Sequence, residues 1–183
     1  MRKPFDPGAA AVALEALNLN ALNRELGQHW LSLWDGGALP GRGALNPSHL
    51  VKFLPGLAVM EIHPDDSIRF RIAGRAFRAA YGFDPSRHDM LALTPPDQRA
   101  ARVARCRQIA EGTVSSGIRL AHRSAAPEMI SQDVMLPLGR IAENGSRAWI
   151  FHASWRPGLT DWQGRLPAMA VGMVDSYVAR ALA

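Results

Sequence analysis

Cysteine is almost absent from this chain of 183 residues, with Cys106 as the single example. One thiol excludes an intramolecular disulfide and is typical of a reducing compartment. Long apolar runs are missing as well, since no stretch approaches the roughly 20 apolar residues that span a bilayer. Asp6 and Glu15 interrupt the N-terminal segment, which argues against a secretory signal. We therefore expect a cytoplasmic protein without a membrane anchor.

Metal-ligand spacing is also missing, because the six histidines form no His-x-x-x-His pair and no Cys-x-x-Cys pair exists. The densest local group of candidate ligands is His63 with Asp65 and Asp66. These aspartates fit a hairpin turn, in which they bond to the local backbone. We expect no metal at this turn.

Lysine is scarce among the 21 basic residues, which are almost all arginine. The net charge of +5 and the pI near 10.3 would suit a nucleic-acid partner, because cationic surfaces attract phosphate. However, the arginines are scattered along the chain and are not interleaved with aromatic side chains. The densest group predicts a solvated helix face or a partner surface, and it consists of Arg99, Arg102, Arg105 and Arg107. The distribution argues against nucleic acid.

Apolar residues recur every three or four positions over 9–35, which predicts one helical stripe that ends at Gly36-Gly37. Asn18, Asn20 and Asn23 are poor helix formers and can divide this helix in two. Further along, a turn is expected at 46–48, where Asn precedes Pro and Ser.

Alternation of apolar and polar residues predicts five strands. Their approximate ranges are 57–62, 68–72, 117–123, 129–138 and 147–155. The second and third strands are separated by two expected helices, one over 75–81 with Gly82 as its C-cap and one over 94–111 with Thr94 as its N-cap. The last strand is apolar on both faces, so we expect the N-terminal helix to cover the back of the sheet.

The organisation expected is one α+β domain over 38–156, a helical extension over 1–37 and a tail over 157–183. Apolar spacing in the tail suggests a closing helix that carries Val171, Val174, Val178 and Leu182. Side chains on the apolar stripes should form the packed interior, and these are Trp30, Phe70, Ile72, Val134, Trp149 and Phe151.

Four segments together point to a family. They are Trp30 within a helix, Leu39-Pro40, Phe53-Leu54-Pro55 and Phe70-Arg71-Ile72-Ala73-Gly74. In this order the chain resembles a group of short bacterial proteins with a PAS-like domain, over about residues 22–151. The resemblance implies an antiparallel sheet of about five strands, with short helices on one face and an N-terminal helix on the other. It also implies a non-catalytic sensor or regulatory interaction module in signal transduction.

PAS-like folds bind ligands between the sheet and its short helices, so the resemblance implies a cavity there for a small molecule. Its expected lining, with Arg75 and His122 as polar contacts, is Arg75, Phe77, Tyr81, Val103, Leu120, His122, Val134 and Trp149.

Two alternatives to a cofactor-free sensor stay open at this point. One is a redox or gas sensor that holds haem through His88, His122 or His152. The other is a small cavity enzyme that uses Asp133 or His122, although no second acid or base stands beside Asp133 in the sequence. Flavin photochemistry at Cys106 is disfavoured, because the residues around it depart from the flavin-reactive motif.

The remaining chain is too short for an output domain, so we expect it to act on a signalling protein or on a second copy of itself. The N-terminal helix carries a second apolar line beside its main stripe, and one helix rarely buries two lines against one sheet. This predicts a homodimer. The residues expected at its interface are Leu14, Leu17, Leu19, Leu22 and Leu26.

Overall fold

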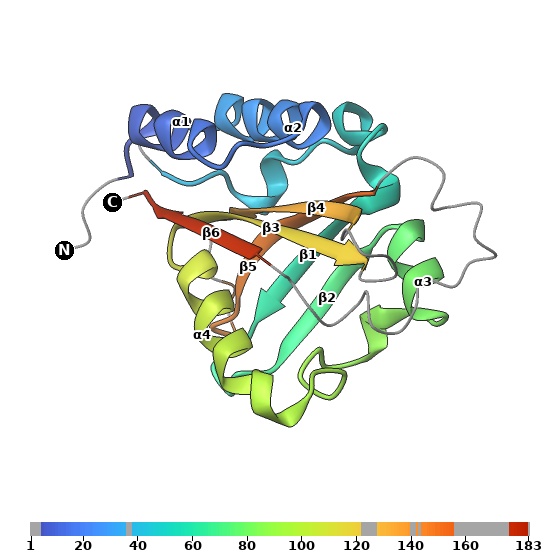
Figure 1. The fold of residues 1–183 in the computed structure, drawn as a ribbon. Helices are drawn as coiled ribbons and strands as arrows, with labels where there is room; N and C mark the ends of the chain where they lie inside the picture. The colour runs from blue at the N-terminus through green and yellow to red at the C-terminus, as the bar shows by residue number, and fades with distance from the viewer. Residues whose placement is uncertain are drawn as a thin grey trace.

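The structure is a computed structural model that describes residues 5–35, 38–121, 128–139, 142, 144–155 and 176–182. Within these residues, six strands form one antiparallel sheet in the order β2-β1-β5-β4-β3-β6 (Figure 1). The strands are β1 (Leu57–Ile62), β2 (Ile68–Ala73), β3 (Thr113–Ala121), β4 (Glu128–Pro137), β5 (Arg147–Trp155) and β6 (Ser176–Ala181).

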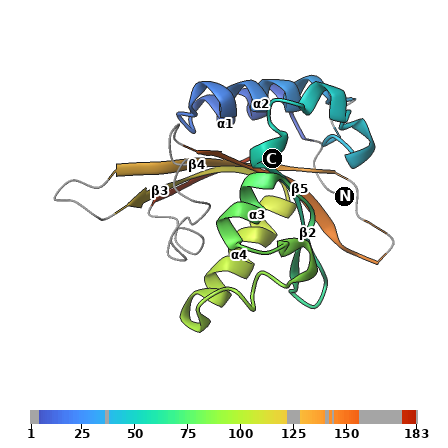
Figure 2. The ribbon, with the colours of Figure 1, turned by 90° about the vertical axis from the view of Figure 1, so that its right-hand side faces the viewer.

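Helices cover both faces of the sheet (Figure 2). On one face, called the α1/α2 face, lie α1 (Pro7–Glu15) and α2 (Ala21–Ser32). On the other, called the α3/α4 face, lie α3 (Arg75–Tyr81) and α4 (Arg99–Ala110). Each face has its own cluster of buried apolar side chains. The α+β architecture and the covered back of the sheet are therefore as predicted, with β6 as an additional strand.

Short 3-10 turns connect these elements. They are η1 (Arg42–Ala44), η2 (Pro47–Leu50), η3 (Leu54–Gly56), η4 (Pro85–Arg87) and η5 (Pro96–Gln98). The turn expected at 46–48 is confirmed, because the Asn46 side chain accepts a hydrogen bond from the Ser48 amide at 3.0 Å and caps η2. In the described part of the chain, no helix has the length and apolarity needed to cross a bilayer.

The N-terminal layer consists of two helices, as the asparagines between them predict. Asn18 adopts a left-handed backbone with a φ of 49°, which ends the first helical segment. The Asn20 side chain accepts a hydrogen bond from the Asn23 amide at 3.0 Å and caps α2. From α2, the Trp30 ring donates a hydrogen bond to the Pro137 carbonyl at 3.0 Å and fixes the helix to the end of β4.

The segment that precedes β1 approaches the main chain of the sheet closely. Gly74 has no side chain, and a Cβ there would collide with the carbonyl oxygen of Leu54. The Gly74 amide donates to the Leu57 carbonyl at 2.8 Å. The end of β2 therefore packs so closely against the chain before β1 that only glycine fits at position 74.

A β-bulge on β2 changes one prediction about the interior. Val59 pairs with Ile72 and Met60 with Phe70, so Arg71 is the extra residue. Phe70 is buried at 3% exposure, as predicted, whereas Ile72 is 53% exposed. The prediction for Ile72 was wrong because strict alternation fails at a bulge.

Cap predictions succeeded at the end of α3 and failed at the start of α4. Gly82 has a φ of 73° and ends α3, as expected. Thr94 does not cap the next helix, because its hydroxyl donates to the Met90 carbonyl at 2.6 Å and α4 begins only at Arg99, after η5.

The tail ends in a strand, so the closing helix predicted there is wrong over 176–181. β6 pairs with β3, with Val178 opposite Ser116. Leu182 is 1% exposed and joins the core of the α1/α2 face. A strand at this place covers the edge of β3, which would otherwise present unpaired amides and carbonyls. Val171 and Val174 lie outside the described residues.

Candidate functional site

Aromatic side chains pack together on the α3/α4 face beside β1 and β2. The Phe77 ring of α3 lies 5.6 Å from the Phe70 ring and 5.3 Å from the Phe151 ring, measured between centroids. Tyr81 lies 6.1 Å from Phe70. These spacings are those of rings in direct contact. This part of the face is therefore packed by the chain's own side chains.

Several residues predicted to line the cavity meet in this region, and others do not. Phe77 and Trp149 are buried there, and Tyr81 and Val103 pack against the same cluster. Arg75 is exposed at the start of α3. The backbone of Leu120 lies in β3, while His122 lies outside the described residues.

The structure contradicts the prediction that Val134 lines the pocket. It is fully buried, but its side chain belongs to the core of the α1/α2 face. Met135, the next residue, belongs to the core of the α3/α4 face. Because β4 is buried on both faces, the alternation of its residues could not show which residues face α1 and α2 and which face α3 and α4. The side chain of Asp133 consequently lies on the α3/α4 face, together with Met135.

A polar floor lies on the α3/α4 face where β3, β4 and β5 run side by side. We give this name to Ser115, Ser131 and Asp133, whose exposed fractions are 0%, 1% and 0%. Ser131 Oγ donates to Asp133 Oδ1 at 3.4 Å. The direct neighbours of Asp133 across the strands are Gly117 and Ala153, which add almost no side-chain volume.

Burial of the polar floor needs a physical explanation. Ser115 Oγ has no hydrogen-bond partner among the described residues, and buried polar atoms are normally paired. Placing a carboxylate in the interior is costly unless other groups compensate it. The sequence pattern singled out Asp133 but not Ser115. The signal that could have found it is Gly117 inside a strand, which often marks a close approach by a backbone or a ligand.

Asp133 and Ser131 do not form a recognisable catalytic pair. A serine nucleophile needs a base beside it, yet His152, on the adjacent strand β5, faces α2 on the opposite side of the sheet. The Tyr81 hydroxyl, which could have served as a proton donor, bonds instead to the Met90 sulfur at 3.6 Å.

A hydrogen-bonded network on the α1/α2 face contrasts with the polar floor. His152 Nδ1 donates to Asn23 Oδ1 at 2.6 Å, since the Asn23 amide nitrogen donates to the Gln132 carbonyl at 2.8 Å. Gln132 Oε1 accepts from the Asn20 amide at 2.6 Å. Burial lowers the pKa of His152 to about 4, so its imidazole is neutral near pH 7. The network docks α2 on β4 and β5.

The candidate haem ligands are spread over different parts of the structure. His152 faces α2, as just described, and not the α3/α4 face. His88 is exposed and packs against the Phe83 ring at 4.6 Å. The third candidate, His122, lies outside the described residues.

The turn between β1 and β2 has the local role that its aspartates predict. Asp65 Oδ1 accepts hydrogen bonds from the Ser67 hydroxyl at 2.8 Å and the Ser67 amide at 3.1 Å, and the bond from the hydroxyl lowers the Asp65 pKa. Asp66 forms an ion pair with Arg107 of α4. Among the described residues, no three His, Cys, Asp or Glu side chains gather as a metal site would require.

Cys106 lies on the inner side of α4, in the same core cluster as Ile109 and Ala110. It is buried, and burial raises the pKa of its thiol to about 11. The thiol is therefore protonated at neutral pH and a poor nucleophile.

The leucines expected at a homodimer interface pack mostly within the chain itself. Leu14, Leu17, Leu19 and Leu26 are buried in the core of the α1/α2 face, and Leu22 packs partly buried against it. The two helices together cover the sheet, so both apolar lines find partners inside the molecule. These leucines do not supply the exposed surface on which the dimer was predicted. The oligomeric state stays a prediction.

Fold and site together define a class of protein. It is a single-sheet α+β domain with a helical layer on each face and a buried polar floor on the α3/α4 face. A family model described as PAS domain matches residues 20–149, which is more than half of the chain. The chain belongs to the PAS domain family. A search of curated proteins finds no match to it.

Proposed function

We propose that this PAS domain is a non-catalytic sensor that binds a small molecule against the polar floor. PAS domains are generally sensory modules, which supports the class of function. The observation that carries the ligand site is the burial of Ser115, Ser131 and Asp133 opposite Gly117 and Ala153. A sheet face that served packing alone would carry apolar side chains at these positions.

The chemistry of the floor indicates the class of ligand. A carboxylate accepts hydrogen bonds and attracts positive charge, and a hydroxyl can donate or accept. On the same face, Met135 of β4 is the direct neighbour of Ser115, and Phe151 of β5 is the direct neighbour of Met135. The proposed ligand therefore has an amine, amide or hydroxyl group at one end and an apolar or aromatic body at the other.

Two adjacent serines provide a matched test. Ser115 and Ser116 are both buried in β3, but Ser115 pairs with Met135 and faces α3/α4, whereas Ser116 pairs with Val134 and faces α1/α2. We would screen small amines, amides and alcohols by thermal shift and titrate the hits. Ser115→Ala should weaken binding by about tenfold, the loss expected for one hydrogen bond in a buried site.

Ser116→Ala should leave the affinity unchanged in the same titration, because its hydroxyl lies on the other face. Equal weakening by the two substitutions would indicate a general loss of structure and would contradict the site. A hit whose affinity is insensitive to both Ser115→Ala and Asp133→Asn would contradict it as well. A purified protein that absorbs between 350 and 450 nm would favour the haem alternative.

A further inference from the structure

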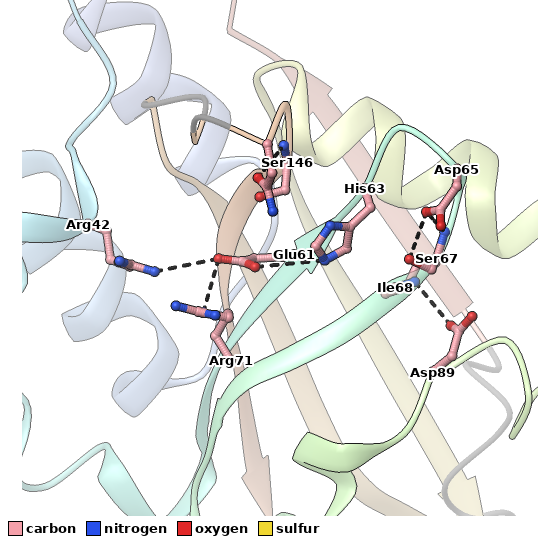
Figure 3. Close-up of polar contacts among 10 residues, drawn as sticks. Arg42, Glu61, His63, Asp65, Ser67, Ile68, Arg71, Asp89 and Ser146 are labelled. Carbon is pink, nitrogen blue, oxygen red and sulfur yellow. Dashed lines mark hydrogen bonds and ion pairs between the residues drawn. The ribbon is translucent and has the colours of Figure 1, made fainter.

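The outer face of β2 is not covered by the N-terminal helices. Ile72 is 53% exposed, and Arg69 and Arg71 are exposed beside it. The bulge at Arg71 places its side chain toward Glu61 of β1, as Figure 3 shows. We call this surface, formed by Arg42, Glu61, Arg69, Arg71 and Ile72, the β2 outer surface.

Glu61 lies at the centre of this surface and is only 5% exposed. Its Oε1 atom is 3.5 Å from Arg42 Nη1 and 3.4 Å from Arg71 Nε (Figure 3). Direct hydrogen bonds between a guanidinium and a carboxylate are about 2.7–2.9 Å. Both arginines are thus oriented by one buried carboxylate without being held tightly by it.

The charges around Glu61 do not balance. Two guanidinium groups face one carboxylate, which leaves one net positive charge, and Arg69 lies directly across from Glu61 on β2. Each guanidinium has five donors in a planar fork that suits carboxylates. Both side chains are 54% exposed, so their remaining donors are accessible.

The end of β2 next to the turn already has a main-chain partner. Asp89 Oδ1 accepts a hydrogen bond from the Ile68 amide at 3.0 Å (Figure 3). It also accepts one from the Leu91 amide at 2.9 Å. The Met90 amide donates to the Ile68 carbonyl at 2.8 Å. Strand addition is therefore blocked at this end, and recognition would depend on side chains of the β2 outer surface.

We propose that the β2 outer surface docks an acidic segment of a protein partner. One carboxylate of the segment bridges Arg42 and Arg71, and a neighbouring apolar side chain covers Ile72. Charge complementarity favours this occupant, because the surface is cationic around an exposed aliphatic residue. Nucleic acid fits less well, since the five residues of the β2 outer surface include no aromatic side chain for base stacking. This partner surface is separate from the proposed ligand site.

The test uses a fluorescein-labelled peptide, Gly-Glu-Glu-Leu-Glu-Glu-Gly, and a control peptide with glutamine at each glutamate. Fluorescence anisotropy is measured with the full chain at low salt, where exposed charges act most strongly. The acidic peptide should bind and the glutamine peptide should not. Arg42→Gln with Arg71→Gln should weaken binding by about tenfold or more, since two charge-assisted hydrogen bonds are lost.

The control is the double variant Arg78→Gln with Arg180→Gln, which loses the same two positive charges at positions outside the β2 outer surface. Arg78 is 60% exposed and also pairs with a carboxylate, Asp84 at 3.7 Å, and Arg180 is exposed on β6. This variant should bind the acidic peptide nearly as well as the parent. If the Arg71 change disturbs β2, Arg42→Gln alone tests the surface, because Arg42 lies in η1 outside the sheet.

Equal weakening by the two double variants would show attraction by overall charge only and would overturn the proposal. Failure of the acidic peptide to bind at low salt would overturn it as well. The proposal would also be overturned if a single-stranded oligonucleotide bound more tightly than the peptide and lost affinity in the Arg42→Gln with Arg71→Gln variant.

Discussion

Both faces of the sheet are buried, but the polar side chains on the two faces differ in their hydrogen bonding. On the α1/α2 face, His152, Asn23 and Gln132 bond to one another and to the loop before α2. On the α3/α4 face, Ser115 Oγ has no partner among the described residues, and Asp133 is fully buried between Gly117 and Ala153. The first arrangement holds a helical layer in place. The second is the place where we propose that a small molecule binds.

Residues on β2 give the largest expected effect and test how the α3/α4 face is built. Phe70→Ala removes a buried ring and should lower the free energy of unfolding by about 3–5 kcal/mol. Ile72→Ala, on the exposed side of the bulge, should change it by less than about 0.5 kcal/mol. Urea denaturation of both variants measures the difference. Similar losses would contradict the bulge and the separation of the two side chains.

The pH dependence of stability tests the α1/α2 face. Burial lowers the folded-state pKa of His152 from 6.5 to about 4. The unfolded state therefore takes up a proton below pH 6.5 while the folded state stays neutral, so stability is complete above pH 6.5 and falls as the pH falls toward 4. The loss should be on the order of 3 kcal/mol.

His152→Gln provides the comparison for this prediction, because its amide can still donate but cannot titrate in this range. Denaturant curves at several pH values between 4 and 7 should show a smaller decline for the variant than for the parent. Identical declines would mean that other groups cause the pH dependence.

A pair of smaller substitutions compares the two faces directly. Asn23→Ala removes the partner of His152 Nδ1 and of the Gln132 carbonyl, and should cost about 1–3 kcal/mol. Ser115→Ala removes a hydroxyl without a described partner and should leave stability unchanged or raise it by up to about 1 kcal/mol. Melting temperatures of the two variants report this. A large loss in Ser115→Ala would show that its hydroxyl is structural.

The architecture could be predicted from the sequence, because apolar stripes on the helices and strands mark the buried faces. Trp30, Phe70 and Trp149 lie on such stripes and are all buried. The sequence could not indicate which face of β4 meets which helices, because both faces are buried and both carry apolar as well as polar side chains. Val134 was therefore placed on the wrong side. Ile72 was misplaced because a bulge adds one residue to the alternation.

Long-range polar contacts were beyond prediction for a different reason. The partners His152 and Asn23 are 129 positions apart, and no local pattern links them. The strand β6 was also missed, because an edge strand of six residues can have a helix-like apolar spacing. For the site, the sequence pointed to the aromatic residues Phe77 and Tyr81, while Ser115 became apparent only from its burial.

The central claim is that a small molecule binds on the α3/α4 face of the sheet over the polar floor. Methyl NMR of the full chain, titrated with a hit from the thermal-shift screen, tests it most directly. The methyl groups of Met135 and Ala153, which lie on the α3/α4 face, should shift with ligand concentration. Those of Val134 and Leu136, which alternate with them on the α1/α2 face, should stay in place. Shifts confined to Val134 and Leu136, or equal on both faces, would contradict the account.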